Sequence, residues 1–525
     1  MERERIPWYW QARTAVLLAL PVLLTGMYGT NYVFLAAHTP HRCVVPECEG
    51  GDGVDGRPES AVWAHATRAW GEWALLPDEP CHRPRPLTTH CRDATAFDNT
   101  TLLPCDRHLY SHSATIVSEF DLGCQEWKRT LVGTIHNVGM LVSLPIMGYV
   151  SDRWGRRAAL VGSGAGAGLF GLAKSFVTSY PTYLVMEFSE TVFGASVYPA
   201  AFVLMIEWLG VEQRILASLL LGVPLAAGAA SLALLDYVVG YWRTWARFAY
   251  PPSFLLLLYP WLLPESMRWL VAKGRISEAI ETIKRATRGN KSDFSEETIH
   301  RMLATDLVTE KVEVVVEEES LFRAFIKYGA LRRRLGVCFA WWASGVFVFY
   351  GLAVRAHALS GSPHGNYALL AAAELPALLL NTLLLDRVGR RPLLTAAFLL
   401  TALALTVIPL LPEGSVAGTV LFLAGKMGAT MALNALYVYT AELFPTRARQ
   451  RLLAACSTCG RFGAILAPQT PLLAAYGAWV PTSVLGALPL LSAALTRLVP
   501  DTLGRRLPDS FADLGSSATD LSDLP

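Results

Sequence analysis

The chain has 525 residues, of which 53% are hydrophobic and only 17% charged, and its formal net charge is +2. A soluble protein carries about a quarter charged residues, so this composition excludes an ordinary soluble domain. Lysine and arginine are dispersed along a nearly neutral chain, which argues against nucleic acid as a partner. The first apolar run is also too long for a cleavable signal peptide. A lipid bilayer is the expected environment.

Apolar runs of about 20 residues, enough to cross a bilayer, occur twelve times. Their expected limits are 14–37, 129–150, 158–176, 181–209, 214–235 and 246–263, then 334–356, 367–385, 392–411, 416–439, 452–475 and 480–499. These runs predict an all-α membrane protein with two six-helix bundles. The expected divisions are an N-terminal bundle over 1–263, a linker over 264–333, a C-terminal bundle over 334–499 and a tail over 500–525.

Clusters of arginine fix the expected orientation in the membrane. The tracts SDRWGRR, LDRVGRR and TRARQR follow the second, eighth and tenth spans on short loops. Loops rich in arginine face the cytoplasm, so both termini and the linker are expected there. The loop over 38–128 is then extracellular.

This outer loop contains six of the nine cysteines, namely Cys43, Cys48, Cys81, Cys91, Cys105 and Cys124. An even number of cysteines in one extracellular segment predicts a disulfide framework, although six cysteines allow 15 pairings. Asn99-Thr100-Thr101 is a glycosylation acceptor, and the loop is a plausible surface for homo-oligomer formation. Cys338, Cys456 and Cys459 lie in spans, where they predict packing and no metal site.

The linker contains amphipathic sequences such as RISEAIETIKRAT, which predict short cytoplasmic helices without catalytic residues. No nucleophile with a base, phosphate-binding loop or metal cluster is evident, so neither an enzyme nor a cofactor is expected.

A repeated motif marks the same place in each six-span half, GYVSDRWGRR over 148–157 and LLLDRVGRR over 383–391. Six-span repeats are typical of transporters whose substrate site lies between the two halves. An aspartate paired with arginine beside a tight glycine turn predicts a latch that closes in one transport state and opens in the other. The expected gating residues are Asp152, Arg153, Gly155, Arg156 and Glu207, with Asp386, Arg387, Gly389, Arg390 and Glu442 in the second half.

With these motifs, the chain resembles the organic ion transporter family of the major facilitator superfamily. Further matches are IVSEFDLGC at 116–124, LPESMRWLVAKGR at 263–275, YTAELFPTRARQ at 439–450 and VPDTLGRRLPDS at 499–510. The resemblance covers nearly the whole chain, and it implies the twelve-helix fold of that superfamily and transport of small organic ions across the plasma membrane. It also implies the disulfides Cys43–Cys105, Cys48–Cys91 and Cys81–Cys124.

Arg461 in the eleventh span occupies the position where anion-transporting relatives have arginine and cation-transporting relatives have aspartate. A guanidinium in a dry cavity binds a carboxylate through two parallel hydrogen bonds, and Gly460 and Gly463 leave room beside it for a ligand or a partner helix. The alternative is a structural ion pair with a buried carboxylate. Phe349 and Tyr350 resemble the aromatic tract of the anion branch, with ordinary packing as their alternative. The expected substrate-binding residues are Arg461, Phe349, Tyr350, Glu374, Lys426 and Asn434.

Two features depart from the anion-transporting pattern. Leu378 stands where relatives have a lysine in the eighth span, and Glu187 stands where the family carries an arginine in the fourth, with Glu190 one turn on. These two glutamates predict proton coupling, pairing with Lys426 or Arg461, or loss of transport. Two functions follow: a secondary transporter of organic anions that works by alternating access, and a receptor-like protein that binds without translocation.

Overall fold

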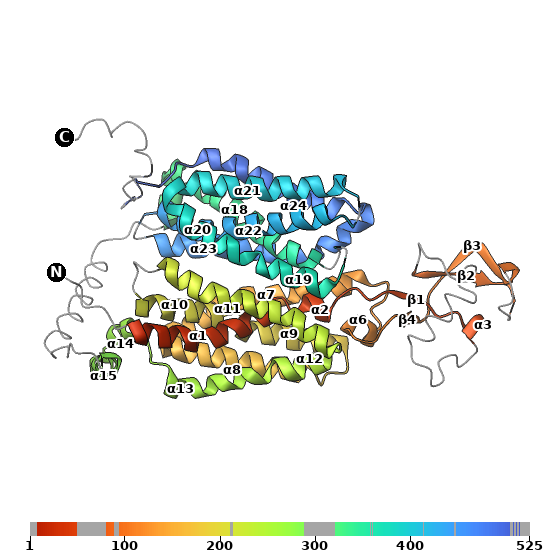
Figure 1. The fold of residues 1–525 in the computed structure, drawn as a ribbon, viewed down its shortest axis with the longest axis horizontal. Coiled ribbons are helices and arrows are strands. Elements are labelled where there is room, and N and C mark those ends of the chain that lie inside the picture. The colour runs from red at the N-terminus through yellow and green to blue at the C-terminus, as the bar shows by residue number, and fades with distance from the viewer. Residues whose placement is uncertain are drawn as a thin grey trace.

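The computed structural model describes residues 8–49, 80–88, 94–209, 214–287 and 321–504, without 357–358, 360, 413 and 446–447, and also residues 508, 511 and 514. Long helices lie side by side in two groups that face each other along their length (Figure 1). One group comes from the first half of the sequence and the other from the second half. The two halves are therefore separate bundles that meet along one interface.

The first group covers the six predicted spans of the N-terminal half. Its helices are α1 (Trp8–Tyr28), α2 (Tyr32–Leu35), α7 (Glu126–Trp154), α8 (Arg156–Lys174), α9 (Tyr180–Gly194), α10 (Val197–Leu209), α11 (Arg214–Val239), α12 (Trp242–Ala249), η3 (Pro251–Leu258) and α13 (Tyr259–Leu262). Prolines lie inside α1, α7 and α11, where neighbouring helices in a membrane bundle accommodate the lost hydrogen bonds.

The second group covers the six predicted spans of the C-terminal half. Its helices are α18 (Gly329–Arg355), α19 (Pro363–Ala372), α20 (Glu374–Val388), α21 (Arg390–Val407), η5 (Ile408–Leu410), α22 (Val416–Leu443), α23 (Arg449–Leu466), η6 (Ala467–Tyr476), α24 (Val480–Leu495) and η7 (Thr496–Leu498). Every predicted span thus coincides with a helical segment.

Nine helical stretches in the described part of the chain are long and apolar enough to cross a membrane. The ranges 158–176, 246–263 and 452–475 are helical but are not among these nine. In the first of them, α8 carries Arg156, Arg157 and Lys174 within 19 residues. Twelve membrane crossings are consistent with the helices of the two bundles. The exact number remains a prediction from hydropathy.

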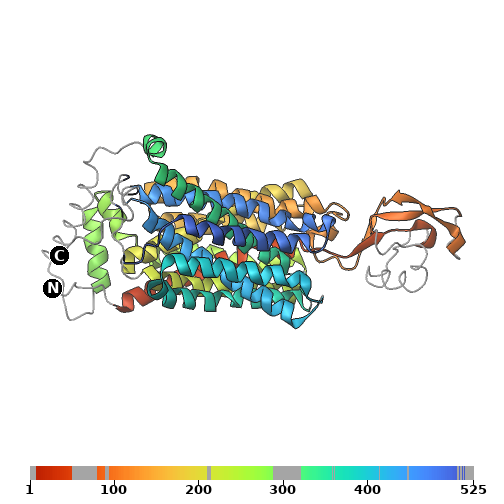
Figure 2. The same ribbon diagram turned by 90° about the horizontal axis from the view of Figure 1, so that it is seen from above.

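The cysteine-rich loop contains short strands that extend from one end of the bundles (Figures 1 and 2). Strand β1 (His41–Cys43) pairs antiparallel with β4 (His108–Tyr110), and β2 (His82–Pro86) pairs antiparallel with β3 (Phe97–Pro104). The described part of the loop also contains three short helices, namely α3 (Pro46–Glu49), η1 (Ala94–Ala96) and α6 (Ile116–Glu119).

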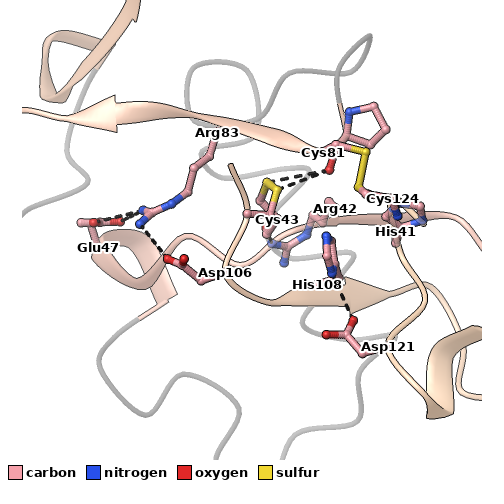
Figure 3. Close-up of a disulfide and its surroundings, with 12 residues drawn as sticks. His41, Arg42, Cys43, Glu47, Cys81, Arg83, Asp106, His108, Asp121 and Cys124 are labelled. Carbon is pink, nitrogen blue, oxygen red and sulfur yellow. Dashed lines mark hydrogen bonds and ion pairs between the residues drawn. A yellow bond between two sulfur atoms is a disulfide. The ribbon is translucent and has the colours of Figure 1, made fainter. Parts of the chain in front are cut away.

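Disulfides join these strands (Figure 3). The predicted pairs Cys43–Cys105 and Cys81–Cys124 are both present. Cys48 is also disulfide-bonded, whereas Cys91, its predicted partner, lies outside the described residues. Beside the first bridge, the Arg83 guanidinium donates to both carboxylate oxygens of Glu47 at 3.0 and 3.2 Å. Covalent and ionic links together stabilise the described part of the loop.

The predicted glycosylation site lies on strand β3, where Asn99 and Thr101 are exposed. The Thr100 and Thr101 hydroxyls donate to the Asp98 carboxylate at 2.6 and 2.8 Å, and the Thr100 backbone N–H donates at 2.9 Å. These hydrogen bonds lower the pKa of Asp98 to about 2.

Short helices of the predicted linker lie at the opposite end from the strands (Figure 2). They are α14 (Met267–Ala272) and α15 (Ile276–Thr287), and α17 (Leu321–Lys327) precedes α18. A small apolar cluster of Trp269, Leu270, Val271 and Ala279 joins α14 to α15. Residues 288–320 of the linker lie outside the described residues.

Candidate functional site

The first repeated motif forms the sharp turn between α7 and α8. Gly155 has φ +106°, a conformation that L side chains rarely adopt, and an added Cβ would lie 2.2 Å from Glu265 Oε2. The Glu265 carboxylate accepts from the backbone N–H groups of Arg156 and Arg157 at 3.0 and 3.1 Å, and from its neighbour Ser266 at 2.9 Å. Burial raises the pKa of the Glu265 carboxyl, and the N–H donors act against that shift. The carboxylate thus caps the N-terminus of α8.

The second motif repeats this arrangement between α20 and α21. Gly389 has φ +107°, and an added Cβ would lie 2.5 Å from Asp501 Oδ2. The Asp501 carboxylate accepts from the backbone N–H groups of Arg390 and Arg391 at 3.2 and 3.3 Å, and from that of Thr502 at 2.8 Å. Sequence reasoning quoted both tracts, LPESMRW and VPDTLGRR, but missed Glu265 and Asp501 as capping residues. An acidic residue directly after a proline in each tract was the available signal.

The predicted latch aspartates are less buried than these capping residues. The Asp152 side chain is 79% exposed and pairs with Arg156 at 2.9 Å, and the Asp386 side chain is 58% exposed and pairs with Arg390 at 3.0 Å. Each pair spans one turn within a single bundle. Exposed pairs of this kind contribute about 0.3–0.5 kcal/mol.

The two predicted gating glutamates, Glu207 and Glu442, contact the same arginines and are more buried than the aspartates. Glu442 accepts from Arg390 Nε at 3.0 Å and from the Thr502 hydroxyl at 2.5 Å, and Glu207 lies 3.7 Å from Arg156 Nε. Arg153 and Arg387 are exposed near the C-terminal ends of α7 and α20. The motifs therefore join parts of one bundle to each other, and none of their described ion pairs links the two bundles.

A buried cluster of charged residues lies inside the N-terminal bundle. Lys174 Nζ donates to Glu187 Oε2 at 2.6 Å, to Glu190 Oε2 at 2.6 Å and to the Tyr250 hydroxyl at 3.0 Å. His136 Nδ1 lies 2.7 Å from Glu187 Oε1. The Lys174 and Glu187 side chains are fully buried, and those of His136 and Glu190 are at most 2% exposed.

This cluster corrects the expected pairing of Glu187 and Glu190 with Lys426 or Arg461. Both glutamates pair with Lys174 at the C-terminal end of α8, a residue that sequence reasoning missed. A lysine inside the predicted span 158–176 was the signal that pointed to it. Buried ions in a membrane are stable only when paired. The positive charge of Lys174 therefore stabilises the two buried carboxylates of Glu187 and Glu190.

Four predicted substrate-binding residues meet in the C-terminal bundle. Lys426 Nζ lies 2.8 Å from Glu374 Oε1 and 3.2 Å from the centroid of the Phe349 ring. The ring of Tyr350 contacts that of Phe349 edge-on at 5.5 Å between centroids. The lysine is thus neutralised by a carboxylate and also held over an aromatic face.

Asn434 does not join this group through its described hydrogen bond, because its amide donates to the Thr430 carbonyl of its own helix at 2.9 Å. Leu378 stands where anion-transporting relatives have a lysine. It packs against α11 of the other bundle, where a Cβ on Gly222 would lie 2.8 Å from the Leu378 side chain.

Arg461 is half-buried on α23 and reaches toward the other bundle. Its Nη1 lies 3.7 Å from the sulfur of Met140 on α7, and among the described residues no carboxylate pairs with it. The space beside the neighbouring glycines, Gly460 and Gly463, is occupied by helix α18 and not by a ligand cavity. A Cβ on Gly463 would lie 2.2 Å from the Ala343 carbonyl of that helix. The guanidinium therefore faces the interface between bundles with only a weak acceptor in contact.

The two bundles meet closely at the end that carries the cysteine-rich loop. The Thr130 hydroxyl of α7 donates to Gln469 Oε1 of η6 at 3.0 Å, and the Gln469 amide donates to the Thr134 hydroxyl at 2.6 Å. His364 Nε2 of α19 lies 2.9 Å from Asp236 Oδ2 of α11. This end of the interface is closed by polar contacts between the bundles.

Comparison with known proteins gives the family. Residues 119–468 match the Major Facilitator Superfamily. Solute carrier family 22 member 13 of Homo sapiens is 30% identical to the chain, over 96% of the chain and 90% of its own length. The chain belongs to the Major Facilitator Superfamily, and within it to solute carrier family 22. Solute carrier family 22 member 3 of Rattus norvegicus is 32% identical over 81% of the chain and 78% of its own length.

Solved structures of the superfamily share the fold. The proton:xylose symporter XylE bound to 6-bromo-6-deoxy-D-glucose has a TM-score of 0.61 at 14% identity, over 96% of this chain and 99% of that chain. The family resemblance and the superfamily fold predicted from the sequence are confirmed. This member of solute carrier family 22 is a multi-pass membrane protein and a secondary transporter, not an enzyme.

Proposed function

We propose that this solute carrier transports small organic anions and that Arg461 binds the anionic group. The observation that carries the proposal is the half-buried guanidinium, which has a thioether and no described carboxylate in contact. Lys174 and Lys426, by contrast, are each neutralised by carboxylates in their own bundle. A cation without a counter-ion in a membrane bundle is costly, so a bound anion is the partner that the arrangement favours.

The position of Arg461 also suits alternating access. It lies on the C-terminal bundle but contacts Met140 of the N-terminal bundle, so a substrate bound there would touch both halves. The polar contacts at the loop end close one side, whereas the gating motifs at the opposite end stay within their own bundles. We propose that the gating residues keep each bundle rigid while the two bundles rock about the substrate.

We further propose the plasma membrane as the location, with both termini and α14–α15 in the cytoplasm and the cysteine-rich loop outside. The strands and the linker helices lie at opposite ends of the bundles, which supports placing them on opposite sides of the membrane (Figure 2). In this orientation Asn99 is available for glycosylation, and the disulfide-bonded loop is the proposed surface for any homo-oligomer.

The test uses purified protein in lipid vesicles with labelled benzoate, chosen because a carboxylate pairs with a guanidinium through two parallel hydrogen bonds. Hydrogen bonds to charged groups contribute about 1.5–3 kcal/mol, so Arg461→Gln is expected to weaken benzoate binding about tenfold to a hundredfold. Arg461→Lys is expected to be similarly impaired, because a point charge does not reproduce the planar two-bond fork.

Arg451→Gln is the matched control, since Arg451 is an exposed arginine on the same helix. Unchanged benzoate uptake in Arg461→Gln would overturn the assignment of Arg461. Benzoate binding without any uptake would instead favour the receptor-like alternative. Uptake of organic cations but not anions by the wild-type protein would refute the proposed substrate class.

A further inference from the structure

We propose that His136, Glu187, Glu190 and Lys174 form a proton-binding site that couples proton movement to anion transport. The proposal rests on the proposed transport of organic anions and adds the coupled ion to it. The proton acceptor is His136 Nε2.

The first argument is the balance of charge in the cluster. Lys174 contributes one positive charge and the two glutamates contribute two negative charges, so with neutral His136 one negative charge is uncompensated. All four side chains are at most 2% exposed, and a buried uncompensated charge in a membrane is costly. Binding of one proton makes the cluster neutral.

The second argument identifies the atom that accepts the proton. Glu187 accepts from Lys174, and a carboxylate has no proton to donate, so His136 Nδ1 donates to it across 2.7 Å. In the neutral imidazole the other nitrogen, Nε2, is then an acceptor. His136 Nε2 is buried and has no hydrogen-bond partner among the described residues.

The third argument is a cavity beside the imidazole. It has about 30 Å³ of space for water, and a water molecule needs about 10–15 Å³ of such space, so about two molecules fit. His136, Glu190, Tyr28, Thr191 and Ser253 are among the residues that line it.

Besides His136 Nε2, the Glu190 carboxylate is the described group of the cluster that can take the proton, and the ¹⁵N titration below distinguishes the two. Three hydrogen bonds already occupy all the N–H groups of Lys174. The other titratable or polar groups packed around the cluster are hydroxyls and an amide, which are neutral at ordinary pH; they are Tyr28, Asn31, Tyr32, Tyr183 and Tyr250. The imidazole is the group whose ordinary titration falls near neutral pH.

The link to transport runs along one face of α7. Met140 follows His136 by one helical turn, lines the same cavity and touches the Arg461 guanidinium. An anion at Arg461 and a proton at His136 carry opposite charges, so each increases the affinity for the other. The expected mechanism is co-transport of a proton with the organic anion.

The first test needs no substrate. Protein labelled with ¹⁵N-histidine is placed in lipid nanodiscs, and the signal that His136→Gln removes is followed between about pH 5 and 8. Glutamine still donates to Glu187 but carries no titrating nitrogen. The exposed His112 supplies the control variant His112→Gln. A change of the His136 signal from the neutral to the imidazolium pattern in this range supports the proposal, and a constant neutral pattern overturns it whether or not benzoate is carried.

The second test measures coupling. Benzoate affinity of the wild-type protein is expected to rise about fivefold or more from pH 8 to pH 5.5, with uptake of about one proton per bound benzoate. In His136→Gln both effects are lost, and in His112→Gln both remain.

Proton uptake per bound benzoate is measured on the wild-type protein. It therefore tests the coupling even if His136→Gln does not fold. Benzoate binding without proton uptake, at an affinity independent of pH, would refute the coupling and leave anion transport standing. Absence of benzoate binding at every pH would instead refute the proposed function, and the ¹⁵N titration would still decide the proton site.

Discussion

Replacement of Lys174 by methionine tests whether the buried cluster holds the N-terminal bundle together. Methionine keeps the length and apolar stem of the side chain but removes the charge and the three hydrogen bonds to Glu187, Glu190 and Tyr250. Two fully buried carboxylates then face each other without a cation. Loss of one partner from a buried ion pair costs about 3–5 kcal/mol, so Lys174→Met is expected to destabilise the protein by at least that much.

The assay is thermal unfolding of detergent-solubilised protein, with Lys273→Met as the control because Lys273 is exposed on the linker side. The triple replacement Lys174→Met with Glu187→Gln and Glu190→Gln removes all three charges and is expected to recover much of the lost stability. This recovery separates an electrostatic effect from a packing effect. A single variant Lys174→Met as stable as the control, or a triple variant no more stable than the single one, would refute the reasoning.

Three further predictions concern the gating motifs, the outer loop and the second buried pair. Glu265→Ala removes the acceptor of the Arg156 and Arg157 N–H groups at the start of α8 and is expected to destabilise the fold by about 0.5–2 kcal/mol, whereas the exposed Asp152→Asn costs about 0.3–0.5 kcal/mol; equal melting shifts would contradict this ranking. Asn99→Gln is expected to abolish a glycosidase-sensitive gel shift in protein expressed in animal cells, and a persistent shift would place the glycan elsewhere. Lys426→Met is expected to destabilise the C-terminal bundle, with partial rescue by Glu374→Gln in thermal unfolding, and the absence of rescue would argue against their ion pair as a stabilising contact.

The helical fold could be predicted from the sequence because its cause is local. A membrane span requires about 20 consecutive apolar residues whose backbone groups bond within the segment, so each of the twelve runs indicates a helix without knowledge of its neighbours. The glycines at 155 and 389 also reflect a local need, the positive φ of a tight turn. The disulfides Cys43–Cys105 and Cys81–Cys124 were correct, but only family resemblance selected them among the 15 pairings.

The partners of the charged residues were decided by the tertiary structure. Glu187 meets Lys174 and His136, and the Glu265 and Asp501 carboxylates accept from the backbone N–H groups of Arg156 and Arg390. Hydropathy gives the length of a helix. It does not give the rotation of the helix about its axis, or which residues of a neighbouring helix lie at the same level in the bundle. A buried charge is neutralised by whichever group packing brings within about 3 Å, and for Glu187 that group lies on another helix, α8.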